Sequence, residues 1–291
     1  MSGNWNRNFF LLLCAGAFVR LWQINLLPPV SSQTNVSLRF LTAFLGIISI
    51  ILFYRIVQKL FKNKAIALWS AFWMNFSPWH IAESRIISPM VGVNFLILLG
   101  IWCLVSDKKR IGWGILIGGI LLFFRFSWMF QSISIVELHS FVINILKYLS
   151  PDFLFFFNDT FWWGGFKEVG ILTPLAFFPL VCGIYSLFYF QKWVHKTILF
   201  WGFVLPLIIA SASPTSPETQ EFFLAIPIIS FVVGLGTVFL YNFLNKKLLG
   251  RYVFLVFLIA LSFEFLYTWH IYLTHYQVRV KNEIFYEKRI F

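Results

Sequence analysis

The chain has 291 residues, of which 59% are hydrophobic and only 12% are charged, and its formal net charge is +12. A soluble globular domain carries about 25% charged residues, so this composition excludes an ordinary soluble protein. Long apolar runs recur along the chain, and a helix needs about 20 residues to cross a bilayer. The sequence therefore predicts an all-α, polytopic integral membrane protein with a single transmembrane domain over residues 1–291.

The apolar runs predict about nine transmembrane helices. In chain order they lie near residues 9–23, 39–56, 66–76, 91–105, 111–124, 169–190, 198–212, 222–243 and 252–271. We interpret the first as a retained helix, because Arg20 and Gln23 stand where a signal peptide needs small residues. All three cysteines fall inside these segments, and neither a disulfide framework nor a metal-ligand spacing follows from them.

Basic residues gather in every second loop between the predicted helices. They occupy residues 55–64, 108–110, 192–196 and 246–251. Such loops stay on the cytoplasmic side of a membrane, so we expect a cytoplasmic N-terminus and, after nine spans, an external C-terminus. This placement favours a multi-pass protein of the cell membrane and argues against a nucleic-acid-binding protein.

The segment SPWHIAESRIISPM, residues 77–90, places His80, Glu83 and Arg85 between two apolar runs. Its opening Ser-Pro pair is typical of a helix start, so residues 79–87 are predicted to form a short interfacial helix. Burying a charge in lipid costs at least a few kcal/mol, which makes these groups candidates for a site. An ordinary polar helix end at the membrane interface explains the pattern equally well.

The segment around residues 126–168 is predicted to be external and interfacial. Polar residues form one stripe over residues 140–149, as in a helix that lies in the membrane surface. The aromatic stretch that follows, SPDFLFFFNDTFWWGG, contains Asp152 and Asp159. This stretch could dock a lipid or acyl chain, or it could be a lid packed on the protein's own helices.

Several stretches occur in the order seen in a known family. They are RLWQINLLPP, VSLRFLTAFLGIISIILFYRIVQKLF, SPWHIAESRI, YLSPDFLFFFND followed by GILTPLAFFPLVCGIYSL, and FLAIPIISFVVGLG. Up to about Tyr276 the chain resembles the bacterial C-type membrane glycosyltransferases, family 39-like, which are related to protein O-mannosyltransferases and lipid A aminoarabinose transferases. The resemblance implies a GT-C fold and transfer of a sugar from a polyprenyl-phosphate donor to an acceptor at the outer membrane face. Its partners would be the lipid-linked sugar and membrane lipids, with no nucleic acid, and we expect no cofactor and assign no metal ligand.

The resemblance also implies roles for particular residues. In this family a carboxylate of the first outer loop acts as general base on the acceptor hydroxyl, and cationic residues at the membrane edge hold the donor phosphate. Arg20, Arg39 and Arg85 match family arginines, and with His80 they are the candidates for substrate binding. We expect the three arginines to border an outward-open cavity.

The chain is shortened where the family carries its acidic first outer loop. Only VSSQTNVS stands there, and no Asp or Glu precedes Glu83. The candidates to replace the missing base are Glu83, Asp152 and Asp159, and whether the chain is an enzyme stays open.

Three functions follow from these patterns. The first is an active transferase, and the second is a catalytically inactive paralogue that binds lipid or a partner. The third is a transporter or flippase of lipid-linked sugars, which would need broken helices with ionisable residues at mid-membrane. Only Glu264 approaches that requirement.

Overall fold

A computed structural model describes residues 5–22, 24, 36–129, 138–156, 169–190, 193–212 and 222–276. Over these residues the secondary structure is helical, without strands. The longer helices are α1 (Trp5–Leu21), α2 (Val36–Phe61), α3 (Lys64–Phe76), α4 (Pro78–Arg85), α5 (Pro89–Val105), α6 (Lys109–Met129), α7 (Leu138–Leu149), α8 (Phe177–Phe190), α9 (Trp193–Ser211), α11 (Ile226–Leu244) and α12 (Leu248–Ile271). Four short helical turns are η1 (Asp152–Phe156), η2 (Pro174–Ala176), η3 (Phe223–Ala225) and η4 (Tyr272–Tyr276).

Each of the nine predicted apolar segments overlaps most of one of these helices, although the sixth was predicted from residue 169 and its α-helix, α8, begins only at Phe177. Three of the described helices are long and apolar enough to cross a membrane, at Val36–Phe61, Phe223–Leu244 and Leu248–His275. The pair α4 and α5 makes a fourth if it is counted as one span, and it bends by 113°. Over the part of the chain that the structure describes, the protein is therefore an all-helical membrane protein.

Local sequence signals explain where several helices begin. The Asn63 side chain accepts hydrogen bonds from the backbone N–H groups of Ala65 and Ile66 at 2.9 and 3.2 Å, and so caps α3. Ser77 caps α4 through the N–H of His80 at 3.4 Å, and proline holds the first position of the helix. The predicted short helix at residues 79–87 is thus present as α4.

The bend between α4 and α5 lies at a second serine–proline pair. Ser88 has an extended backbone, with φ −107° and ψ 118°, and Pro89 opens α5. A proline disfavours helical geometry in the residue before it and lacks an N–H for the preceding turn. The chain therefore stops one helix and starts the next in a new direction.

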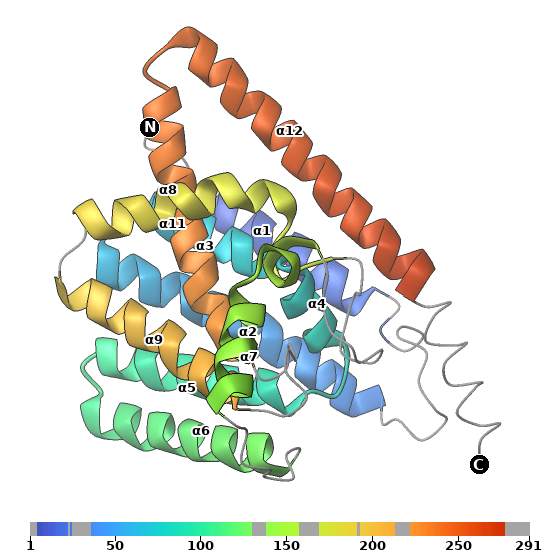
Figure 1. Ribbon diagram of the computed structural model, residues 1–291, viewed down its shortest axis with the longest axis vertical. Helices are drawn as coiled ribbons and strands as arrows, with labels where there is room; N and C mark the ends of the chain where they lie inside the picture. Colours follow the sequence, from blue (N-terminus) through green and yellow to red (C-terminus); the bar gives the residue numbers. More distant parts are fainter. Residues whose placement is uncertain are drawn as a thin grey trace.

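Helix α11 lies in the middle of the bundle and packs against both α3 and α8 (Figure 1). Small residues permit this approach, since a methyl group at Gly234 would lie 2.5 Å from the backbone nitrogen of Ser70. One at Gly236 would collide with the carbonyl of Pro179 in α8. Close packing at small residues is how membrane helices associate without a hydrophobic driving force between them.

Helix α12 turns back from the end of α11 and runs diagonally along the outer side of the body (Figure 1). Only 17% of its most apolar window is buried, against 78% for the span that contains α11. One anchor is Glu264, whose carboxylate accepts the N–H of Leu175 at 3.0 Å, at the start of η2. Carboxylates are favourable at helix N-termini, so Glu264 holds α12 to the beginning of α8.

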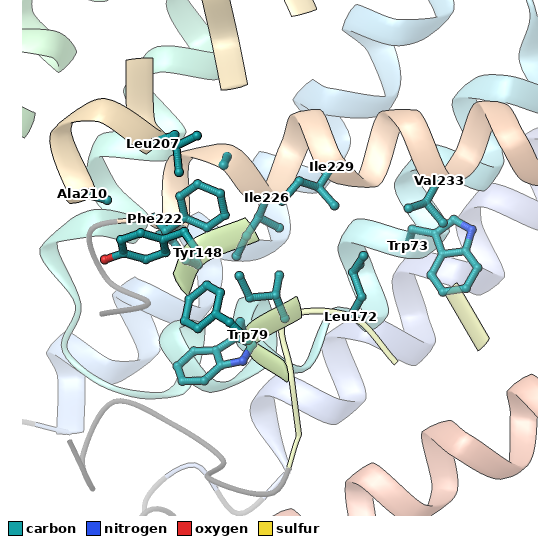
Figure 2. Packing of buried hydrophobic residues seen from close by; sticks show 14 of the residues in the cluster. Trp73, Trp79, Tyr148, Leu172, Leu207, Ala210, Phe222, Ile226, Ile229 and Val233 are labelled. Carbon is teal, nitrogen blue, oxygen red and sulfur yellow. The ribbon is translucent and has the colours of Figure 1, made fainter. Parts of the chain in front are cut away.

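The main core joins α3, α4, α9 and α11 to the long segment between α6 and α8. Figure 2 shows Trp79 of α4, Tyr148 of α7 and Phe222, which precedes η3, in this cluster, and the ring centroids of Tyr148 and Phe222 lie 5.1 Å apart. Phe153 and Phe155 of η1 are also buried in it. These two aromatic side chains of the predicted external segment therefore pack on the protein's own helices.

The predicted helix at residues 140–149 is present as α7, but its polar stripe is divided. Asn144 is buried and donates from its side chain to the carbonyl of Ser211 at 3.1 Å, whereas Lys147 is exposed. Apolar residues such as Leu138 and Leu146 are exposed, at 78% and 62%. The helix thus turns a polar residue inward and apolar residues outward.

Candidate functional site

Helix α4 is buried along its whole length. All eight of its residues are buried, including His80, Glu83 and Arg85, which have no exposed surface. Gly46 of α2 makes room for the helix, because a methyl group there would lie 2.5 Å from Ser84 Oγ. The candidate residues of α4 therefore face neighbouring helices.

Arg20, in the last turn of α1, reaches across to α3 and α4. Its Nη1 donates to the carbonyl of Gly16 at 3.0 Å and to Asn75 Oδ1 at 2.9 Å. Its Nη2 donates to the carbonyl of Asn75 at 3.0 Å and contacts His80 Nδ1 at 2.8 Å. Asn75 in turn donates to the carbonyl of Leu12 at 2.8 Å, which locks α1 against α3.

Arg85, at the end of α4, binds the C-terminal end of α1. Its Nη1 donates to the carbonyls of Val19 and Arg20 at 2.6 and 3.1 Å, and its Nη2 to that of Trp22 at 2.7 Å. A helix C-terminus presents unpaired carbonyls and partial negative charge, so a cation is stabilising there. Arg85 Nε donates to the Tyr272 hydroxyl at 2.8 Å.

Arg39, in the second turn of α2, completes the group. It is 2% exposed and donates from Nη1 to the carbonyl of Ile24 at 3.2 Å. The positive charge of Arg39 lies close enough to Tyr272 to act on its hydroxyl group. In the same way, the charge of Arg85 acts on Arg20. The three arginines thus gather around residues 19–24.

The expectation that these arginines border an outward-open cavity is wrong for this structure. Arg20 and Arg85 have no exposed surface, and Arg39 has almost none. Their guanidinium groups bind backbone carbonyls in the last turns of α1 and just after it, and side chains of α3, α4 and η4.

The three candidate acids have different surroundings. Glu83 is buried on α4, between His80 and Arg85 in the sequence. Asp152 is exposed at the start of η1. Asp159 lies outside the described residues, as does the short first loop.

Two partners of the arginine group were not predicted from the sequence, Asn75 and Tyr272. Asn75 did carry a signal, since it is a polar residue at the end of an apolar run. Tyr272 carried none, because it is one of ten tyrosines and lies 187 residues from Arg85. Over the described residues, no three His, Cys, Asp or Glu side chains are grouped in a way that could hold a metal ion.

The fold and the site together define a class of protein. Over the described residues it is a helical membrane protein whose buried arginines link α1, α2 and α4. A family model described as dolichyl-phosphate-mannose-protein mannosyltransferase matches residues 11–127. The matched part begins in α1 and ends in α6, so it contains all three arginines and α4. No curated protein and no solved structure matches the chain.

The family match supports the resemblance to the family 39-like glycosyltransferases. It suggests a membrane glycosyltransferase of the mannosyltransferase type, and lipid-linked sugars of the dolichyl-phosphate kind are the donors of that family.

Proposed function

We propose that the protein transfers a sugar from a polyprenyl-phosphate donor to an acceptor at the outer face of the cell membrane. In this proposal nine helices cross the membrane, the N-terminus is cytoplasmic and the C-terminus is external. Helix α4 then lies toward the outer face, where it would meet the head group of the donor.

The buried arginine group is the observation that carries this proposal. The hydrogen bonds of Arg20 run to two carbonyls, one amide oxygen and one imidazole nitrogen, all of them neutral. Arg85 lies close enough for its positive charge to act on that of Arg20. Burying a guanidinium group whose hydrogen bonds all go to neutral groups is costly, and an anion such as the donor phosphate would offset that cost at Arg20.

Glu83 is the acid that we propose as general base. It is the candidate carboxylate that α4 carries beside His80 and Arg85, whereas Asp152 is exposed on η1. A general base has to lie within hydrogen-bond distance of the acceptor hydroxyl, close to the bound donor. We therefore choose among the three acids by their position in the fold and not by their pKa.

The test is sugar transfer by the purified protein in detergent, with polyprenyl-phosphate mannose as donor and released polyprenyl phosphate as the readout. Removing a general base costs about 10²- to 10⁴-fold in rate, so Glu83→Gln should lose activity by that factor. Asp152→Asn is the matched control and should keep wild-type activity. Loss of activity in Asp152→Asn with full activity in Glu83→Gln would contradict the assignment.

A second candidate function is an inactive paralogue that binds lipid phosphate without transferring sugar. The absence of any Asp or Glu before Glu83 favours it, because the family's base is expected in that region. Binding of polyprenyl-phosphate mannose without turnover, for any sugar donor tried, would decide for this candidate.

A further inference from the structure

The hydrogen bond between Arg20 and His80 fixes the tautomer of the imidazole. Arginine has no acceptor, so in the 2.8 Å contact its Nη2 donates and His80 Nδ1 accepts. Ser84 Oγ also lies 3.5 Å from Nδ1, but its single proton is donated to the carbonyl of His80. The imidazole is therefore neutral, with its proton on Nε2.

The Nε2–H group of His80 has no hydrogen-bond partner among the described residues, although it is completely buried. The Nε–H of Arg20 is in the same situation. An unpaired buried donor costs about 1–3 kcal/mol, and such groups are rare in folded proteins. Because two of them belong to one hydrogen-bonded pair, a ligand with acceptor oxygens would satisfy both donors at one place.

The ring of His80 has two close neighbours that limit its movement. It stacks on Phe223 of η3, with centroids 5.6 Å apart and an interplanar angle of 23°. Helix α2 also lies close to the ring, because a methyl group at Gly46 would lie 3.6 Å from its Cε1. Rotating the ring to pair Nε2 elsewhere would break the Arg20 bond and this packing.

We propose that His80, held as the Nε2–H tautomer by Arg20, donates a hydrogen bond to a phosphate oxygen of the bound lipid. A guanidinium group next to a fixed neutral N–H donor suits an oxyanion. Because Nδ1 is engaged and Nε2 carries a proton, His80 serves as a donor and not as the base. This inference rests on the proposed function and adds a second, uncharged contact to the phosphate.

Two substitutions separate the roles of the ring nitrogens. In His80→Asn the amide can replace Nδ1, and its oxygen can accept from Arg20, but the Nε2 donor is lost. In His80→Gln the amide nitrogen can reach the position of Nε2 and keep that donor. His139→Asn, at an exposed histidine of α7, is the matched control.

The probes are farnesyl phosphate, farnesol and inorganic phosphate, added to the purified full chain in detergent, with the dissociation constant as readout. Wild type, His139→Asn and His80→Gln should bind farnesyl phosphate. His80→Asn should bind it about 10- to 100-fold more weakly, because one hydrogen bond to a charged group is lost. Farnesol should not bind in the same range. Inorganic phosphate should bind wild type more tightly than His80→Asn, because the proposed contact is to a phosphate oxygen.

Equal binding by wild type and His80→Asn would overturn the inference and leave the proposed function standing. Failure of wild type to prefer farnesyl phosphate over farnesol would overturn both. Should His80→Asn fail to fold, nitrogen-15 NMR of histidine-labelled wild type gives the answer. The His80 signals should be those of a neutral Nε2–H ring and should move with farnesyl phosphate; an Nδ1–H or doubly protonated ring would contradict the proposal.

Discussion

At the scale of single residues, Arg85 shows how a candidate ligand contact can also hold the fold together. Its guanidinium group donates to three carbonyls at the end of α1 and to Tyr272 of η4. It also lies over the rings of Trp269 and Tyr272, 5.8 and 5.2 Å from their centroids. One side chain thus joins α4 to both the first and the last described helices.

We expect Arg85→Ala to destabilise the protein by about 3–5 kcal/mol, because it removes one side of several buried polar contacts at once. Arg85→Lys should cost less but should not be neutral, since an ammonium group cannot reach carbonyls and Tyr272 in the same fork geometry. The measurement is the thermal unfolding midpoint of the purified protein in detergent. The exposed Arg125 provides the control, and Arg125→Ala should leave the midpoint unchanged. An Arg85→Ala variant as stable as wild type would show that these contacts contribute little.

At the scale of elements, the position of α4 depends on one glycine in α2. Gly46 allows the backbone of α2 to approach Ser84, and with it the ring of His80. Helix–helix contacts in membranes gain their stability from such close packing. The depth of α4 in the bundle is therefore set by a residue that bears no functional group.

Gly46→Ala should lower the unfolding midpoint and weaken farnesyl phosphate binding, because the new methyl group would press on Ser84, and overpacking costs about 1–3 kcal/mol. Adding Ser84→Ala removes the oxygen in closest contact and should recover part of the loss. Gly118→Ala in α6 is the control, since nothing lies within 4 Å of a methyl group there. That control should be neutral or stabilising by up to about 1 kcal/mol, as alanine favours helix over glycine. Equal behaviour of the two alanine variants would refute the steric argument.

At the scale of the whole molecule, the charged turns and the candidate site lie on opposite sides. The turns between α5 and α6 and between α11 and α12, which carry basic residues, lie at the left and upper left of Figure 1. Helix α4 and the end of α12 lie at the right. Basic loops remain in the cytoplasm, so this arrangement supports an external position for α4.

A reporter of membrane topology fused after Lys109 should therefore read cytoplasmic, and one inserted at residues 213–220 should read external. The charge difference between alternate loops orients each helical hairpin, which gives opposite readings for these two positions. Reporters that read the same side at both positions would refute the nine-span topology.

The sequence by itself determined the class of protein and the position of its helices. Apolar runs set the helices because a chain in lipid has to satisfy its own backbone hydrogen bonds. The start of α4 could also be predicted from the sequence, because Ser77 caps the helix and Pro78 occupies its first position. The family resemblance also proposed Arg20, Arg39, His80 and Arg85 as substrate-binding residues. The structure brings these side chains near the end of α1, and their role in substrate binding stays a prediction.

Only the tertiary structure decided what each of these residues touches. Arg20 meets His80 across 60 positions of the chain, and Arg85 meets Tyr272 across 187. No local pattern encodes such pairs, because they depend on how helices pack and on small residues such as Gly46 that let them approach. For the same reason the sequence placed the arginines at an open cavity, whereas helix packing buries them and leaves the Nε2–H of His80 and the Nε–H of Arg20 as buried donors without partners among the described residues.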